Sequence, residues 1–197
     1  MSKSKNQSDQ PTENLSFFNT FLTNPREVGS IIQSSRFLKK RIITRANVAS
    51  AKTIVELGPG TGGTTKAILE AMAPDAKLLT IELTSAFMPF LAQIDDDRLI
   101  NHNGDARDIV SILAQYGLDK PDVVISGIPF TPMPTVIGQA IVNEVWQALR
   151  EDGRFLTYQF WNKVKTLSNP VFGNSRVEFE LLNIPPVQLS YFDKRIN

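Results

Sequence analysis

The amino-acid sequence predicts an α/β fold in which helices cover a seven-stranded, mainly parallel β-sheet with one antiparallel strand. From Thr53 onward, strand-like apolar runs alternate with helical stretches, which is the pattern of right-handed βαβ units. A glycine-rich turn follows the first of these strands. The last two strand-like runs are separated only by Pro185 and Pro186, and such a hairpin places one antiparallel strand in the sheet. The predicted architecture is therefore Rossmann-like.

The expected strands and helices alternate along most of the chain. Strands are expected at residues 53–57, 77–83, 98–105, 122–126, 153–161, 176–184 and 187–193. Helices between them are expected at residues 64–72, 85–94, 106–116 and 135–150. Residues 161–175 are predicted to form a loop, because Asn169, Pro170, Gly173 and Asn174 are turn formers.

Two helical segments are expected ahead of this α/β body. Residues 15–23 carry apolar side chains at helical spacing, and a basic amphipathic helix that Ser34 or Ser35 can cap follows. The chain is thus predicted to consist of a disordered tail, an N-terminal amphipathic and basic helical segment and one α/β domain, at residues 1–14, 15–50 and 51–197.

The composition excludes several classes of protein. A chain of 197 residues suffices for one α/β domain. No apolar run approaches the roughly 18–20 residues that cross a bilayer. Cysteine is absent, which rules out disulfides, cysteine nucleophiles and thiolate metal sites. The polar N-terminus lacks the apolar stretch of a secretory signal, so a cytoplasmic location is expected.

Charge is distributed unevenly along the chain. The net charge is +1, which provides no overall attraction to nucleic acid. Residues 1–50, however, contain eight Lys and Arg residues against three acidic residues. This basic arm predicts an anionic partner near the N-terminus.

The strongest local signal is the segment VELGPGTGG at residues 55–63, between a strand and a helix. Its glycines allow a sharp turn and a close approach of the backbone to a ligand. Gly58, Gly60 and Gly63 also satisfy the GxGxxG pattern of dinucleotide sites. A diphosphate at this turn would be repelled by Glu56. A ligand that carries sulfonium and ammonium cations, such as S-adenosylmethionine, would instead be complemented by this carboxylate.

Two further acidic residues follow the next predicted strands. Glu82 can accept hydrogen bonds from ribose hydroxyls, and Asp105 can bind an adenine amino group. With Glu56 and the glycines they resemble the motif series of class I S-adenosylmethionine-dependent methyltransferases, whose product is S-adenosylhomocysteine. The resemblance implies cofactor contacts from Ser35, Glu56, Gly58, Pro59, Gly60, Thr61, Gly62, Glu82, Leu83, Gly104, Asp105, Ala106, Ser126 and Ile128. The alternatives are a structural glycine turn, a nicotinamide or flavin site, and a Ser35 that only caps a helix.

The fourth predicted strand ends in SGIPF at residues 126–130. Class I enzymes that methylate a nitrogen carry a polar residue and a proline here, as in NPPY of DNA enzymes and NIPY of ribosomal RNA adenine dimethyltransferases. Ser126 replaces that Asn and Gly127 is inserted after it, so a side-chain carbonyl that accepts a hydrogen bond from an exocyclic amine is missing. This difference argues against methylation of a nucleic-acid base.

A more specific resemblance covers nearly the whole chain from Phe17. The chain is similar to the bacterial phospholipid N-methyltransferases at residues 17–40, 55–69, 126–130, 149–161 and 181–189. The resemblance implies stepwise N-methylation of phosphatidylethanolamine toward phosphatidylcholine, with a phospholipid substrate and an anionic membrane surface as partners. Ornithine-lipid methyltransferases look similar, so the headgroup stays open. We expect a monomer that associates peripherally with the inner face of the membrane.

The basic N-terminal segment suits such a surface. The predicted membrane-binding residues are Phe17, Phe18, Phe21, Leu22, Arg26, Lys39, Lys40 and Arg41. The apolar side chains would lie in the headgroup boundary, and each basic side chain would add on the order of 1 kcal/mol through anionic phosphates. The alternative is that the aromatic residues pack the first helix onto the core.

Methyl transfer is an in-line displacement at a sulfonium carbon and needs no metal. The protein must align the acceptor nitrogen and remove a proton from the starting ammonium. The predicted catalytic residues are Ser126 and Gly127, whose backbone carbonyls would orient the amine, and Tyr158, which would accept a proton or line the pocket. Phe130 and Trp161 are candidates for contact with the methylated cation, with core packing as the alternative.

Other functions remain open on the sequence alone. An enzyme like the ribosomal RNA adenine dimethyltransferases, or a small-molecule methyltransferase, would use the basic arm for phosphate contacts. A scaffold that no longer binds a cofactor is a different class, against which the intact acidic and glycine motifs argue. Nucleic acid is not the expected partner. His102, the single histidine, lies in a predicted strand and is expected to be structural, so no general base is assigned.

Overall fold

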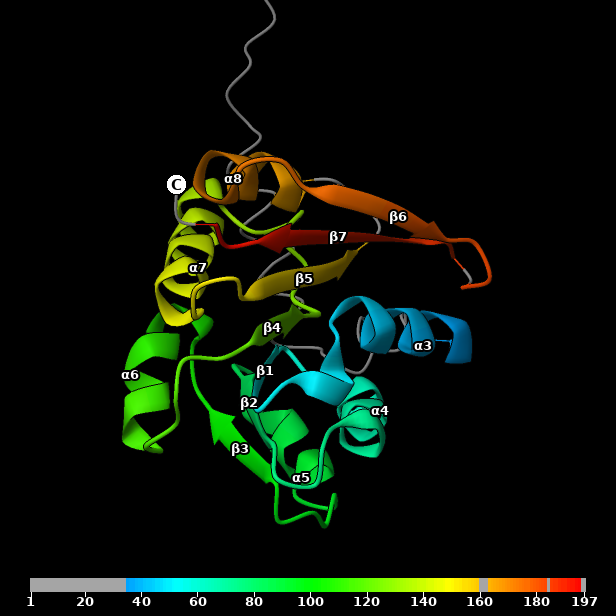
Figure 1. The fold of residues 1–197 in the computed structure, drawn as a ribbon, viewed down its shortest axis with the longest axis vertical. Coiled ribbons are helices and arrows are strands. Elements are labelled where there is room, and N and C mark those ends of the chain that lie inside the picture. Colours follow the sequence, from blue (N-terminus) through cyan, green and yellow to red (C-terminus); the bar gives the residue numbers. More distant parts are fainter. Residues whose placement is uncertain (1–34, 160–162, 184, 196–197) are drawn as a thin grey trace, which may run out of the picture.

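A computed structural model describes residues 35–159, 163–183 and 185–195. Within these ranges seven strands form one sheet of order β3-β2-β1-β4-β5-β7-β6 (Figure 1). The strands are β1 (Thr53–Leu57), β2 (Lys77–Glu82), β3 (Leu99–Asn103), β4 (Val123–Ser126), β5 (Arg154–Gln159), β6 (Arg176–Glu180) and β7 (Val187–Asp193). Neighbouring strands are parallel except where β7 lies between β5 and β6. The predicted Rossmann-like α/β class and its antiparallel strand are confirmed.

Helices cover both faces of the sheet (Figure 1). The labels follow that figure. One face is covered by α3 (Arg36–Arg45), the turn η1 (Val48–Ser50) and α4 (Gly63–Ala71). The other face is covered by α6 (Ile109–Gln115), α7 (Thr135–Ala148) and α8 (Lys163–Phe172). Shorter elements follow β2 and β3, namely η2 (Ser85–Phe87), α5 (Met88–Leu91) and η3 (Ala106–Asp108).

The central strands are buried on both faces. In β1, Val55 and Leu57 pack into the core on the α6–α8 side, whereas Ile54 packs into the core on the α3–α4 side. Burial on both faces explains why β1 and β4 are continuous apolar runs and not alternating ones. The carboxyl ends of β1, β2, β3, β4 and β5 meet at one edge of the sheet, which is where α/β folds place their ligands. We call it the carboxyl edge.

Helix α8 corrects the prediction that residues 161–175 are a loop. Val164, Leu167 and Phe172 are buried at helical spacing, and the Phe172 ring packs against Phe155, with the ring centroids 5.8 Å apart. Pro170 lies inside the helix, near its end, and removes one backbone N–H donor there. The apolar stripe therefore outweighs the turn formers that suggested a loop.

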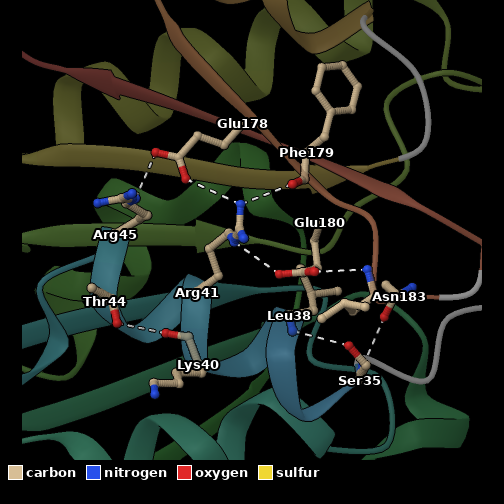
Figure 2. Close-up of polar contacts among 11 residues, drawn as sticks. Ser35, Leu38, Lys40, Arg41, Thr44, Arg45, Glu178, Phe179, Glu180 and Asn183 are labelled. Carbon is tan, nitrogen blue, oxygen red and sulfur yellow. Dashed lines mark hydrogen bonds and ion pairs between the residues drawn. The ribbon is translucent and has the colours of Figure 1, made fainter.

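Helix α3 is the basic helix predicted after Ser35, and it is anchored to the β6–β7 hairpin (Figure 2). Ser35 caps it, since its Oγ accepts a hydrogen bond of 3.2 Å from the Leu38 N–H. The Ser35 N–H in turn donates to Oδ1 of Asn183, at 2.9 Å, in the turn between β6 and β7. The start of α3 therefore lies beside the tip of this hairpin, at the carboxyl edge.

Farther along α3, two arginines pair with carboxylates of β6 (Figure 2). Arg41 Nε lies 3.0 Å from Glu180, which is buried, and Arg45 Nε lies 2.8 Å from Glu178. At the end of the helix, the Arg45 carbonyl accepts a hydrogen bond from Arg154 at the start of β5. Helix α3 thus runs from the carboxyl edge of the sheet to the opposite edge.

The predicted tail at residues 1–14 and the apolar segment at residues 15–23 lie outside the described residues. None of the helices in the described ranges combines the length and the hydropathy needed to span a bilayer.

Candidate functional site

The glycine-rich turn after β1 forms the floor of the candidate site. Gly58 and Gly60 have φ values of 70° and 57°, which favour glycine. A Cβ atom added to Gly58 would lie 3.1 Å from Cγ1 of Ile128, so this glycine permits close packing of two loops. A Cβ atom added to Gly60 would have no other atom within 4 Å. The turn therefore leaves room beside Gly60 in which a ligand can approach the backbone.

Glu56 is a fully buried carboxylate in β1, just before the turn. Its Oε2 accepts a hydrogen bond of 2.6 Å from the hydroxyl of Thr65 in α4. Its Oε1 has no hydrogen-bond partner among the described residues. Burial raises the pKa of Glu56 to about 7, the Thr65 hydrogen bond opposes this rise, and the charge of Glu82 adds to it. A buried oxygen without a partner is costly, which suits a site that a cationic group completes.

Glu82 closes β2 and holds the glycine turn in place. Its Oε2 accepts from the Gly60 N–H at 3.0 Å, and its Oε1 accepts from the Thr84 N–H at 2.9 Å. Burial raises the pKa of Glu82, while these backbone hydrogen bonds act in the opposite direction. The carboxylate thus lies directly against the turn.

Asp105 follows β3 and is already engaged by a cation. Its carboxylate lies 2.7 Å from Nη2 of Arg107, and it caps η3 by accepting from the Arg107 N–H at 2.8 Å. Partial burial alone would raise the pKa of Asp105, but the hydrogen bonds from Arg107 outweigh it and lower the pKa. Beside it, the Gly104 N–H donates to the Glu82 carbonyl at 3.0 Å, Ala106 is buried and Leu83 is exposed. Their predicted adenosine contacts stay predictions.

The loop after β4 lies against the glycine turn. Ser126 is buried, and its Oγ accepts from the Ile128 N–H at 3.2 Å. The Gly127 N–H donates to the Leu57 carbonyl at 2.9 Å. A Cβ atom added to Gly127 would lie 2.6 Å from the hydroxyl oxygen of Tyr158. The structure therefore brings the three predicted catalytic residues, Ser126, Gly127 and Tyr158, together.

The pKa of Tyr158 limits its role. Burial raises this pKa strongly, and the charge of Glu56 raises it further. The hydroxyl, which lies 3.4 Å from Oγ1 of Thr64, therefore stays protonated. A base must be present in its deprotonated form or accept readily, so the raised pKa disfavours the predicted role of proton acceptor, which itself stays a prediction. The role of lining the pocket stays a prediction.

Other predicted contacts differ from the structure. Phe130 is fully buried in the core beside Gly138 of α7, so the core-packing alternative is confirmed and its contact with a methylated cation is wrong. Trp161 lies outside the described residues. His102 has its Nδ1 3.1 Å from the Tyr116 hydroxyl and packs edge-on against that ring, which agrees with a structural role.

The basic side chains of α3 point in different directions. Arg41, predicted to meet phosphates, pairs with Glu178 and Glu180 in this structure, and its contact with lipid stays a prediction. Lys39 points toward α4, since a Cβ atom added to Gly63 would lie 3.8 Å from its Nζ. Lys40 is exposed, and its predicted contact with lipid phosphates stays a prediction. Phe17, Phe18, Phe21, Leu22 and Arg26 lie outside the described residues.

Two polar residues of the site were missed by sequence reasoning. Thr65 orients Glu56, and Gln159, at the end of β5, donates from Nε2 to the Ile128 carbonyl at 3.2 Å. Oε1 of Gln159 is buried without a hydrogen-bond partner in the described part of the chain. A glutamine inside the apolar run FLTYQF was the available signal, because a buried amide needs partners.

Two sequence comparisons bear on this site. The chain is 29% identical over 178 residues to an ornithine lipid N-methyltransferase of Singulisphaera acidiphila, which covers 86% of this chain and 90% of that protein. It is 36% identical over 94 residues to ribosomal RNA small subunit methyltransferase A of Caulobacter vibrioides, which covers 46% of this chain and 34% of that protein. No family model matches the chain.

Solved structures share the fold. The O-methyltransferase TomG of Streptomyces achromogenes, in complex with S-adenosylmethionine, superposes with a TM-score of 0.66 at 15% identity, over 96% of this chain and 93% of that chain. The N-methyltransferase NodS of Bradyrhizobium japonicum, in complex with S-adenosylhomocysteine, has a TM-score of 0.65 at 10% identity, over 92% and 98% of the two chains. At these identities the likeness extends to the fold alone.

Proposed function

We propose that this chain, a class I S-adenosylmethionine-dependent N-methyltransferase related to bacterial lipid N-methyltransferases, methylates the headgroup amine of a membrane phospholipid. The acceptor that we favour is phosphatidylethanolamine, converted stepwise toward phosphatidylcholine. The observation that carries the proposal is the buried Glu56 oxygen without a partner beneath an open glycine turn, because it suits a cationic cofactor. We further propose that the protein works as a monomer at the inner face of the membrane.

The residues around the turn fit the cofactor. Bound S-adenosylmethionine supplies an electrophilic methyl group on a cationic sulfur. Glu56 would balance its positive charges, the backbone at Gly60 would pack closely against it, and Glu82 would accept from its ribose hydroxyls. Asp105 and the neighbouring Leu83 would contact the base. Each of these residues lies at the carboxyl edge of the sheet, so one ligand can contact them all.

The acceptor amine would be oriented by the loop after β4 and by Gln159. The SGIPF loop lacks the side-chain carbonyl that Asn provides in related nitrogen methyltransferases. Gln159 offers such a carbonyl, because its NH2 group donates to Ile128 of this loop and its Oε1 has no hydrogen-bond partner among the described residues. An amine hydrogen bonded to Oε1 would hold the nitrogen lone pair in a defined direction. The protonated Tyr158 hydroxyl would line the same pocket.

Replacing Gln159 by Leu should lower kcat about tenfold, which is the order expected when one orienting hydrogen bond is lost. The dissociation constant of S-adenosylmethionine should stay nearly the same, because Gln159 contacts the β4 loop and not the glycine turn. Steady-state kinetics and calorimetry measure the two quantities. The matched control is Gln139→Leu, on the exposed side of α7. Equal kcat values for both variants would contradict the proposal that Gln159 orients the acceptor amine.

Transfer of labelled methyl groups to a panel of purified acceptors tests the proposal as a whole. We expect labelling of phosphatidylethanolamine presented in detergent micelles and none of ribosomal RNA. Ornithine lipid is the second candidate, favoured by the similarity to an ornithine lipid N-methyltransferase over 178 residues. Labelling of RNA but of neither lipid would overturn the proposal.

A further inference from the structure

The tip of the β6–β7 hairpin exposes large apolar side chains. Leu181 and Leu182 are 71% and 61% exposed, and Phe179 of β6 is also exposed (Figure 2). The hairpin extends beyond the rest of the fold at this end (Figure 1). Because Ser35 is hydrogen-bonded to Asn183 in the same turn, the exposed Phe37 of α3 belongs to the same region. The Phe179 side chain points to the other face of the hairpin, because its neighbours Glu178 and Glu180 point to α3, so we call Phe37, Leu181 and Leu182 the hairpin-tip patch.

The side chains of Glu180 and Asn183 at this turn have partners within the fold. Glu180 accepts from the Leu182 N–H at 2.9 Å as well as pairing with Arg41. Asn183 accepts from Ser35 and donates from Nδ2 to the Pro185 carbonyl at 2.9 Å. Leu181 and Leu182 thus point outward while the Glu180 and Asn183 side chains do not depend on water for hydrogen bonds. A turn of this kind can enter a less polar medium at low cost.

Two exposed cations lie on α3, the helix that carries Phe37. Arg36 and Lys40 are one turn apart on α3, they are exposed, and no ion pair is found for either in the described part of the chain. The Arg36 guanidinium lies 4.8 Å from the centre of the Phe37 ring. The nearby carboxylates of Glu178 and Glu180 are neutralised by Arg41 and Arg45. The patch is therefore apolar at its centre and positively charged at its margin.

We propose that the hairpin-tip patch is a membrane-docking surface that enters the headgroup region of an anionic bilayer, with Arg36 and Lys40 on lipid phosphates. The charge pattern matches such a surface, which attracts cations and accepts apolar side chains. The patch lies at the carboxyl edge, the edge at which the candidate acceptor loop also lies, so docking would turn that edge toward the lipid. This inference rests on the proposed function and adds the surface through which a lipid amine is reached.

Vesicle sedimentation of the full chain tests the docking surface. The variant Leu181→Ser/Leu182→Ser should bind vesicles of phosphatidylcholine and phosphatidylglycerol about tenfold more weakly than the parent. The variant Arg36→Gln/Lys40→Gln should lose binding to these vesicles and show a weaker dependence on salt. Val136→Ser should bind like the parent, because Val136 is 76% exposed but lies at the start of α7, on the other face of the sheet.

The controls separate docking from folding and from catalysis. Both leucines are exposed, so the double Ser variant should keep its melting temperature and its affinity for S-adenosylmethionine. It should also still methylate lipid in detergent micelles, where no bilayer is needed. Unchanged vesicle binding by this variant would overturn the docking proposal. The same holds if the variant binds vesicles like the parent but dissociates a dimer in sedimentation equilibrium, because the leucines would then contact a second copy of the chain. If the parent protein methylates no lipid in micelles, the proposed function itself is overturned.

Discussion

Replacing Glu56 by Gln should stabilise the protein above pH 7 and, at the same pH, weaken S-adenosylmethionine binding at least tenfold. Glu56 is fully buried, and its pKa is raised from 4.5 to about 7. Between these two values the folded state holds a proton that the unfolded state releases. The contribution of Glu56 to stability therefore falls as the pH rises from 4.5 through about 7. Above pH 7 the buried carboxylate is charged, at a cost of about 3 kcal/mol.

The Gln side chain removes this cost because it stays neutral at every pH. Urea unfolding of the ligand-free protein should show a higher free energy of unfolding for Glu56→Gln at pH 8.5 and a small difference at pH 5.5. Calorimetry should show the reverse order for cofactor affinity at pH 8.5, because only the carboxylate complements a cationic ligand. The matched control is Glu70→Gln on the exposed side of α4, which should change neither quantity. Equal cofactor affinity of Glu56→Gln and the parent at pH 8.5 would contradict the charge role of Glu56.

Replacing Gly127 by Ala should lower kcat about 100-fold. The added Cβ would lie 2.6 Å from the Tyr158 hydroxyl and 3.1 Å from the Gly58 carbonyl oxygen, and both distances are below normal contact. The Tyr158 ring is buried and the Gly58 atom belongs to the backbone, so neither can move freely. The loop after β4 must shift instead, and a shift of about 1 Å at reacting groups can cost about 100-fold in rate.

A second substitution tests this steric explanation. In a Tyr158→Phe background the hydroxyl is gone, so Gly127→Ala should lower kcat only roughly tenfold. The effects of the two substitutions on kcat should therefore be strongly non-additive in a double-mutant cycle. Gly117→Ala, in the turn before β4, adds a Cβ with no other atom within 4 Å; the φ of 61° at Gly117 disfavours Ala and should lower stability, but kcat should stay unchanged. An additive cycle would mean that Tyr158 is not the group displaced. Steady-state methyl transfer measures every term of the cycle.

The strand order and the helical layers follow from patterns that the sequence carries locally. Apolar runs such as TIVEL mark strands buried on both faces, and the βαβ rule then limits their order and handedness. Helix α8 was missed because Pro170 and its polar neighbours suggest a turn. Its apolar stripe forms a helix only because α7 and β7 are there to bury it.

The cofactor side of the candidate site could be predicted better than the acceptor side. Glu56, Gly60 and Glu82 are found together because backbone geometry after parallel strands brings them to one edge. The direction of a long side chain depends on partners that are distant in sequence. Arg41 turns toward Glu180, 139 positions later, and no local pattern distinguishes it from the exposed Lys40. Gln159 likewise acquires its role from a loop that belongs to another strand.

Backbone hydrogen bonds connect the loops at the carboxyl edge to the ends of neighbouring strands. The Gly58 N–H donates to the Ile81 carbonyl, the Gly127 N–H to the Leu57 carbonyl and the Gly104 N–H to the Glu82 carbonyl. The loops that would hold the methyl donor and the methyl acceptor are therefore expected to move together. A substitution that moves the loop after β4 should therefore also move the glycine turn. Variants designed to alter the choice of acceptor should then also change the rate at which S-adenosylhomocysteine is released.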